Sequence, residues 1–93
     1  MESKTKCVHV KIYGNVQGVG FRNFVKNLAT KLNLKGWVKN SHDGSVEAIF
    51  EGKEQEIKKI LEYCKKGPSL AKVIRVEVSD EKLKGFNNFE IRY

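Results

Sequence analysis

The sequence is poor in cysteine, proline and histidine, and it contains no long apolar run. Cys7 and Cys64 are too few for a disulfide framework, so we expect two reduced, partly buried thiols. They lack CxxC spacing and form no ligand cluster with His9 and His42, so no metal site is expected. No run approaches the ~18 apolar residues that span a bilayer. The N-terminus also lacks the apolar core of a secretory signal, and a cytoplasmic protein without a membrane partner is expected.

Acidic residues are absent from residues 3–42. The basic residues of this span are Lys4, Lys6, Lys11, Arg22, Lys26, Lys31, Lys35 and Lys39. From Asp43 onward, ten acidic residues balance ten basic ones, so the net charge of +7 arises in the first part of the chain. Each lysine alone is best explained as solvated surface. Together they predict a positive field that would concentrate anionic ligands.

Hydrophobic periodicity predicts the order β-α-β-β-α-β followed by a short final strand. The predicted strands cover residues 8–14, 36–40, 45–51, 73–79 and 89–93, and the predicted helices cover residues 21–32 and 53–66. Asp43-Gly44 is typical of a hairpin turn, Gly52 is expected to break the third strand, and Gly67-Pro68 to stop the second helix. Residues 81–88 are expected to form a polar connection.

This order is the split βαβ pattern of ferredoxin-like α+β domains, with a mainly antiparallel sheet and two helices on one face. We expect residues 1–93 to form a single domain. A right-handed crossover would make the first two strands parallel, with their C-terminal ends at the same edge of the sheet. Asn40 should therefore lie near the loop at residues 14–22.

The sequence Gly14-Asn-Val-Gln-Gly-Val-Gly-Phe-Arg22 joins the first strand to the first helix. No Ser, Thr or Asp stands where an N-cap would precede Phe21, so the first helical amides lack an obvious partner. Free amides, a positive helix end and the Arg22 guanidinium suit a small anion, most plausibly a phosphate. The loop lacks the Gly-Lys-Ser/Thr of a P-loop and the third glycine of a dinucleotide fingerprint. It also has no nucleophile–base pair.

A guanidinium binds two phosphate oxygens at once, and the Asn40 amide can hold a water molecule while donating to a substrate. An amide is a poor base, so the substrate must carry a good leaving group, such as the carboxylate of a mixed carboxylic–phosphoric anhydride. Structural explanations stay open: Arg22 as an exposed helix-start residue, and Asn40 as a turn-initiating residue. Asp43 is taken as structural and His42 as a solvated turn residue, with a minor role for His42 left open.

The loop at residues 14–22 and the run Gly36-Trp-Val-Lys-Asn-Ser-His-Asp-Gly-Ser-Val-Glu47 resemble the two signatures of the acylphosphatases, and the ending Phe89-Glu-Ile-Arg-Tyr93 is also similar. The resemblance implies a small metal-independent hydrolase, which cleaves acyl phosphates to a carboxylate and inorganic phosphate. No cofactor is expected, and nothing in the sequence suggests more than a monomer. The resemblance also implies that Asn40 orients the water for in-line attack, and that Arg22 binds the phosphoryl group together with backbone amides. These are the amides of Asn15, Val16, Gln17, Gly18, Val19, Gly20 and Phe21. Asn15 stands where many relatives carry a basic or other polar residue.

Two other classes of function share some of these features. The basic charge and the fold class are shared with RNA-recognition domains, but the Gly18-Val-Gly-Phe21 run precedes a helix instead of lying on the third strand, which offers only Phe50. Nucleic acid is therefore disfavoured as a partner. A non-catalytic phosphate-binding or regulatory domain would use the same loop, so the sequence leaves that alternative open.

Overall fold

The computed structural model describes residues 4–93; residues 1–3, part of the N-terminal stretch judged unlike a secretory signal, lie outside the described residues. The elements are β1 (Thr5–Asn15), α1 (Phe21–Lys31), β2 (Lys35–Asn40), β3 (Val46–Lys53), α2 (Glu54–Lys66), β4 (Lys72–Glu81) and β5 (Phe89–Ile91). This is the predicted β-α-β-β-α-β order with a short last strand. Among the described residues, no helix is long and apolar enough to cross a membrane.

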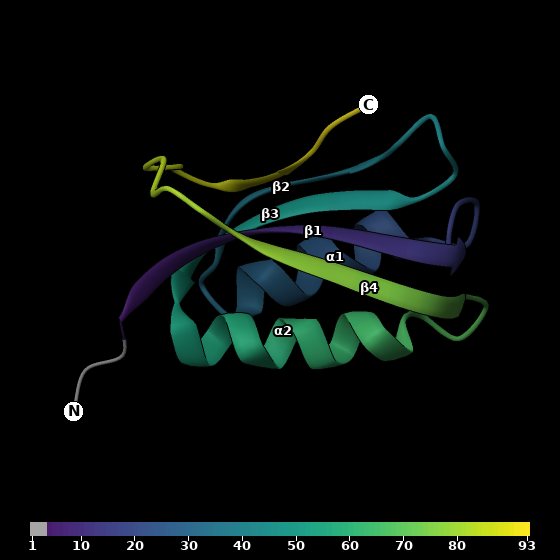
Figure 1. Ribbon diagram of the computed structural model, residues 1–93, viewed down its shortest axis with the longest axis horizontal. Coiled ribbons are helices and arrows are strands. Elements are labelled where there is room, and N and C mark those ends of the chain that lie inside the picture. The colour runs from purple at the N-terminus through teal and green to yellow at the C-terminus, as the bar shows by residue number, and fades with distance from the viewer. Residues whose placement is uncertain (1–3) are drawn as a thin grey trace.

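The strands form one sheet in the order β4-β1-β3-β2-β5, and both helices lie on the same face of it (Figure 1). All neighbouring strands are antiparallel except β2 and β5. The prediction of a ferredoxin-like α+β sandwich is therefore confirmed. Because β1 and β2 both run antiparallel to β3, they are parallel to each other, and their C-terminal ends meet at one edge of the sheet, as expected.

The core lies between the sheet and the two helices. Alternating residues of β1 and β3, such as Val10 and Phe50, face the helices and are fully buried. From α1 the buried residues are Phe21, Val25 and Ala29, and from α2 they are Ile57, Ile60 and Cys64. The three- and four-residue spacing of these side chains places them on one side of each helix, and that side packs against the sheet. Phe89 of β5 closes one end of the core by stacking on Phe50, with ring centroids 5.7 Å apart.

Several predicted strand boundaries are wrong: β1 begins at Thr5 instead of residue 8, β5 ends at Ile91 instead of residue 93, and β3 and β4 both run further than predicted. β3 does not stop at Gly52, because Gly52 pairs with Lys6 of β1 and the strand continues to Lys53. A Cβ at Gly52 would lie 2.6 Å from Leu34 Cδ2, so a larger residue there would displace the end of the Leu34 side chain, and Gly52 lies within the strand instead of breaking it. β4 extends to Glu81 because its pairing with β1 continues as far as Cys7.

The segment between β4 and β5 is tied to the sheet by a carboxylate. Glu51 of β3 is only 7% exposed, and its oxygens accept hydrogen bonds from the backbone N–H groups of Lys84, Gly85 and Phe86 at 2.5, 2.9 and 3.0 Å. The two cysteines are free and fully buried, more so than expected. Burial raises the pKa of Cys7 to about 11, with the nearby Glu51 charge adding to the effect, and raises the pKa of Cys64 to about 12. Both are therefore protonated thiols near neutral pH.

Candidate active site

The loop between β1 and α1 is anchored at one buried side chain and turns at two glycines. Val16 is 1% exposed and holds the loop against the core. Gly18 and Gly20 have φ of 76° and 80°, in the left-handed region that residues with a Cβ rarely adopt. Gly20 is the N-cap of α1 and provides no side-chain hydrogen bond, and the first turn of the helix contains no acidic residue. The prediction of an uncapped helix start is confirmed.

The backbone N–H groups of residues 16–20 remain available for a ligand. Within residues 4–93, none of them donates a hydrogen bond to a backbone carbonyl or a side-chain acceptor. The first helical N–H groups behind them also lack a cap, and they carry the positive end of the helix dipole. The loop therefore presents a concentration of amide donors and partial positive charge to whatever occupies the space in front of it.

That space is a small cleft of about 90 Å³ at the edge where β1 and β2 end. It is lined by Val16, Gly18, Gly20, Phe21, Arg22, Asn23, Asn40, Ile91 and Tyr93. Asn40 is thus brought to Arg22 from 18 positions further along the sequence, as the parallel arrangement of β1 and β2 predicts. Among the lining residues within the described part of the chain, Arg22 is the one with a charged side chain.

Three of the residues whose backbone amides were predicted to bind phosphate are not among the residues that line the cleft. Asn15 is exposed and still belongs to β1, where it pairs with Lys72. The Val19 side chain packs against the hydrophobic core. The Gln17 side chain turns away from the cleft toward the β2–β3 turn. These side-chain positions do not test the predicted role of the backbone N–H groups of Gln17 and Val19.

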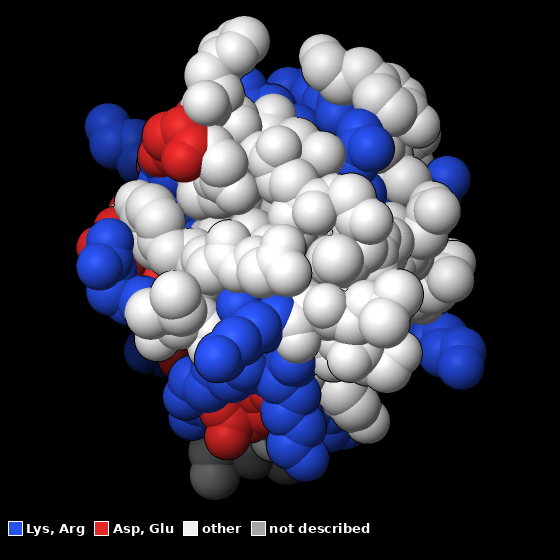
Figure 2. Space-filling view, turned by 90° about the vertical axis from the view of Figure 1, so that its right-hand side faces the viewer, with Lys and Arg blue, Asp and Glu red and all other residues white. Residues whose placement is uncertain are grey.

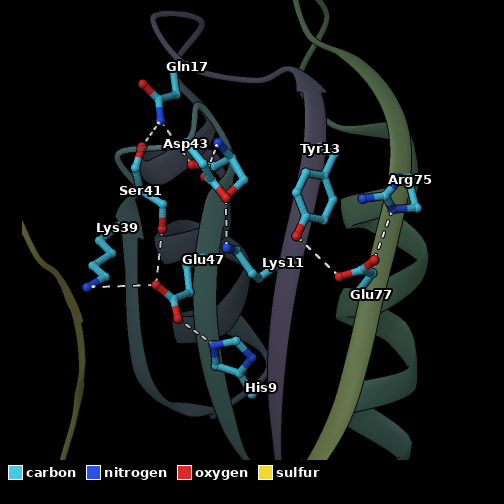
Figure 3. Close-up of polar contacts among 11 residues, drawn as sticks. His9, Lys11, Tyr13, Gln17, Lys39, Ser41, Asp43, Glu47, Arg75 and Glu77 are labelled. Atoms are coloured by element: carbon cyan, nitrogen blue, oxygen red, sulfur yellow. Dashed lines mark hydrogen bonds and ion pairs between the residues drawn. The ribbon is translucent and has the colours of Figure 1, made fainter.

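Gln17 ties the loop to the turn that follows Asn40 (Figure 3). Its Nε2 donates to the backbone carbonyl of Ser41 at 2.7 Å and to that of Ser45 at 3.0 Å. Ser41 directly follows Asn40, so one side chain links the loop that precedes Arg22 to the strand end that positions Asn40. The two halves of the cleft are therefore held together by a specific polar contact.

The turn itself is fixed by Asp43. Its carboxylate accepts from the Ser45 hydroxyl at 2.6 Å, from the Ser45 backbone N–H at 3.0 Å and from Lys11 Nζ at 2.9 Å. Hydrogen bonds from the Ser45 hydroxyl, from Lys11 and from the Ser45 amide hold the pKa of Asp43 well below its usual range. The hairpin prediction for Asp43 is thus extended, because this residue also joins the turn to β1. His42 is exposed in the turn.

A second carboxylate supports Ser41 from the open face of the sheet. Glu47 Oε1 accepts from the Ser41 hydroxyl at 3.1 Å and lies 3.7 Å from Lys39 Nζ, while Oε2 lies 2.5 Å from His9 Nε2 (Figure 3). Burial opposes ionisation of Glu47, but hydrogen bonds with His9 and Ser41 outweigh it and lower its pKa. The segment after Asn40 is therefore held from two sides, by Gln17 and by Glu47.

The uneven charge of the sequence is partly evened out in space. Lys6, Lys11 and Lys39 pair with Glu54, Asp43 and Glu47, acidic residues of the second half of the chain. Figure 2 views the molecule from the end that carries the loop and the β2–β3 turn: uncharged side chains cover most of its centre, Lys and Arg gather around them, and Asp and Glu occupy little of it. Arg22, in contrast to these lysines, forms no ion pair within residues 4–93.

Four features of the site were missed from the sequence: the linking role of Gln17, and the cleft-lining residues Asn23, Ile91 and Tyr93. A signal existed for the last two. The alternation of residues 89–93 predicts a strand, and pairing that strand parallel to residues 36–40 would have carried Tyr93 to the end at which Asn40 lies. No sequence pattern indicates the direction of the Gln17 side chain.

Fold and cleft together define a ferredoxin-like α+β domain with a cationic cleft at the C-terminal ends of β1 and β2. The chain belongs to the acylphosphatase family, whose family model matches residues 8–91. It is 48% identical over 84 residues to an acylphosphatase of Moorella thermoacetica, with 90% of each chain covered. It is also similar to the crystal structure of acylphosphatase from Bacillus subtilis, with a TM-score of 0.92, 40% identity and coverage of 97% and 100% of the two chains. For an acylphosphatase structure from Coxiella burnetii the TM-score is 0.92 at 36% identity, with 95% and 93% covered.

Proposed function

We propose that this protein hydrolyses acyl phosphates, the mixed anhydrides of carboxylic and phosphoric acids, to a carboxylate and inorganic phosphate. Membership of the acylphosphatase family supports this reaction. The observation that carries the assignment of the site is the juxtaposition of Arg22, Asn40 and unpartnered loop amides around one small cleft. These groups have the chemistry that binding and hydrolysis of a small phosphoryl compound require.

Arg22 and the loop amides bind the phosphoryl group. The planar guanidinium donates two parallel hydrogen bonds to two phosphoryl oxygens, and the amides of residues 16–21 donate to the remaining oxygen. Negative charge that moves onto these oxygens in the transition state meets donors already fixed in place by Val16, Gly18 and Gly20. Because the donors do not have to reorganise during the reaction, they stabilise the transition state more than bulk water would.

Asn40 orients the attacking water. Its carboxamide makes no hydrogen bond to another side chain within residues 4–93, and it lines the cleft beside Arg22. The amide oxygen accepts from the water and directs a lone pair toward phosphorus, in line with the departing carboxylate. None of the lining side chains is a carboxylate, an imidazole or a thiolate, so the proton of the water passes to the substrate or to solvent.

The carboxylate leaving group explains how such a site can suffice. A carboxylate departs without protonation, so no general acid is needed, and positioning with charge stabilisation accounts for the acceleration. Within residues 4–93, no group of three or more His, Cys, Asp or Glu side chains is arranged to hold a metal ion. We therefore propose a reaction that does not depend on a metal ion, and activity retained after dialysis against a chelator is the expected result.

The test compares hydrolysis of acetyl phosphate by the wild type with that by Arg22→Ala and Asn40→Ala. Arg22→Ala should lower kcat/KM by on the order of 100-fold or more and weaken binding of inorganic phosphate. Asn40→Ala should lower kcat by on the order of 100-fold with a smaller effect on phosphate binding, since it acts on the water. Lys26→Ala, an exposed cation on α1 outside the cleft, is the matched control.

Wild-type-like turnover in both variants would refute the residue assignment. A wild type that binds phosphate without hydrolysing any acyl phosphate would favour a non-catalytic phosphate-binding domain. The structure offers little support for the RNA-binding alternative, because Phe50 faces the core and the open face of β3 carries Glu47 and the buried Glu51. Carboxylates at the centre of that face oppose a phosphate backbone.

A further inference from the structure

We propose that Tyr93 is a positioning residue for Arg22: its ring lies over the guanidinium and holds it in the orientation that an anion requires. The contact is direct, with Arg22 Cζ 4.9 Å from the centroid of the Tyr93 ring. This inference rests on the proposed function of the cleft, because it assigns Tyr93 a role only if Arg22 binds a phosphoryl group. It adds a second residue from the end of the sequence, beside Ile91, to a site built mainly by the first forty residues.

The pairing of β5 with β2 accounts for the position of Tyr93. Val38 lies opposite Ile91 in this parallel pair, and the Arg92 backbone N–H donates to the Val38 carbonyl at 2.8 Å. Extending the same register by two residues sets Tyr93 beside Asn40. The short β5 therefore carries the chain along the edge of the sheet to the cleft.

Alternation along this segment decides which side chains face the cleft. Ile91 and Tyr93 both line it. Arg92 points to the other face, where its guanidinium lies 5.1 Å from the Trp37 ring and its Nε lies 3.1 Å from a carboxylate oxygen of Glu90. Two neighbouring residues thus have separate environments, and Arg92 is a natural control for Tyr93.

The contact is not explained by core packing. Tyr93 is 97% exposed, so little of its surface is buried in the protein. Within residues 4–93, the Tyr93 ring is the side-chain partner that the structure gives Arg22, which forms no ion pair or side-chain hydrogen bond there. A cation over the face of an aromatic ring is attracted by the ring quadrupole, which favours this arrangement at an exposed site.

Stacking suits a residue that must bind phosphate. The ring contacts the guanidinium through its π face, with Arg22 Cζ over the ring, and it accepts no conventional hydrogen bond, whereas phosphoryl oxygens bind to the N–H groups. A carboxylate partner would have used the same N–H groups. An unrestrained arginine loses side-chain entropy when it binds a ligand, and the ring removes part of that loss in advance.

The size of the effect follows from the strength of an exposed cation–π contact. Loss of the ring should weaken binding of inorganic phosphate by about 2- to 5-fold. The same factor should appear in KM for acetyl phosphate, with kcat changed by less than about 2-fold, because the contact is present in both ground and transition states.

The experiment titrates inorganic phosphate into ¹⁵N-labelled protein and follows the backbone and Arg22 Nε–H signals by NMR. Tyr93→Phe keeps the ring and should bind phosphate like the wild type. Tyr93→Leu keeps an apolar side chain without a π face, and should show the weaker binding together with loss of the ring-current shift at Arg22 Nε–H. Arg92→Ala should leave both measurements unchanged.

A double-mutant cycle separates a role through Arg22 from a general structural role. In an Arg22→Ala background, Tyr93→Leu should have no further effect on the residual phosphate affinity. Equal phosphate affinity in wild type and Tyr93→Leu would overturn the inference while leaving the proposed function intact. An additive loss in the Arg22→Ala background would also overturn it. A wild type that does not bind phosphate would refute the proposed site itself, and the role of Tyr93 with it.

Discussion

Gln17 offers a sharp test of how the two halves of the site are kept together. Its side-chain amide donates to the carbonyls of Ser41 and Ser45, across the gap between the loop and the β2–β3 turn. We predict that Gln17→Leu, which keeps a side chain of similar bulk and removes both donors, impairs catalysis more than it impairs folding. The physical reason is that the hydrogen bonds join two segments whose relative position defines the cleft.

The magnitude follows from the partners that remain. The Ser41 carbonyl still accepts from the Gly44 N–H at 3.2 Å, and the Ser45 carbonyl still accepts from the Ser41 N–H at 2.8 Å. Neither carbonyl is left without a donor, so each lost bond costs its net value instead of a full desolvation penalty, about 1–2 kcal/mol for the pair. These hydrogen bonds hold Asn40 in position relative to Arg22. Loss of the same free energy from stabilisation of the transition state lowers kcat/KM by about 5- to 30-fold.

Acetyl phosphate hydrolysis and urea denaturation on the same protein preparations measure the two effects. Gln17→Glu should be worse than Gln17→Leu, because a carboxylate would face two carbonyl oxygens and would also repel the phosphoryl group. Asn27→Ala removes an exposed amide from α1 outside the cleft and serves as the matched control. A value of kcat/KM for Gln17→Leu within 2-fold of the control would refute this reasoning.

Two further predictions concern stability. Glu51→Gln keeps an acceptor for two of the three backbone N–H groups of residues 84–86 but turns an NH₂ toward the third. Urea denaturation should therefore show a free energy of unfolding lower by about 1–3 kcal/mol. The exposed Glu62→Gln on α2 is the control and should change this free energy by less than about 0.5 kcal/mol; an equal effect of both substitutions would contradict the anchoring role of Glu51. The lowered pKa values of Asp43 and Glu47 mean that the unfolded chain takes up protons first on acidification, so stability is fully present above their ordinary pKa values of 3.8 and 4.5 and is lost as the pH falls below them. The Asp43→Asn, Glu47→Gln double variant should lose less stability than the wild type between pH 6 and pH 3 in the same assay, and parallel curves would exclude these two carboxylates as the cause.

Sequence reasoning was most successful where a local pattern and the chain topology acted together. The missing N-cap before Phe21 follows directly from the residues in the loop, and the structure has Gly20 at that position without a side-chain hydrogen bond. The meeting of Asn40 with Arg22 follows from one right-handed crossover, which fixes the direction of β2 relative to β1. Neither inference depends on the exact length of any strand.

Sequence reasoning was least successful where the neighbours of a residue come from distant parts of the sequence. Glu51 occupies an alternating strand position that predicts a solvent-facing carboxylate, yet it is buried by the segment at residues 84–86. That burial depends on the path of the β4–β5 connection, which no periodic pattern describes. The environment of Gly52 is hidden for a similar reason: its neighbour Leu34 lies in the connection between α1 and β2, 18 positions earlier in the sequence.

The polar groups around the cleft fall into two sets that differ in how they are satisfied. Gln17, Ser41, Asp43 and Glu47 each have protein partners, and no side-chain N or O atom buried within residues 4–93 lacks one. The amides of residues 16–20 and the Asn40 carboxamide have none there, and the guanidinium of Arg22 has only an aromatic face that leaves its N–H groups free. Exposure to water satisfies isolated groups of this kind at little cost, but here they converge on one small cleft. The surrounding residues have their hydrogen bonds satisfied within the protein, while the donors that line the cleft do not. A preorganised oxyanion site requires this arrangement, because its donors are held in place before the ligand binds.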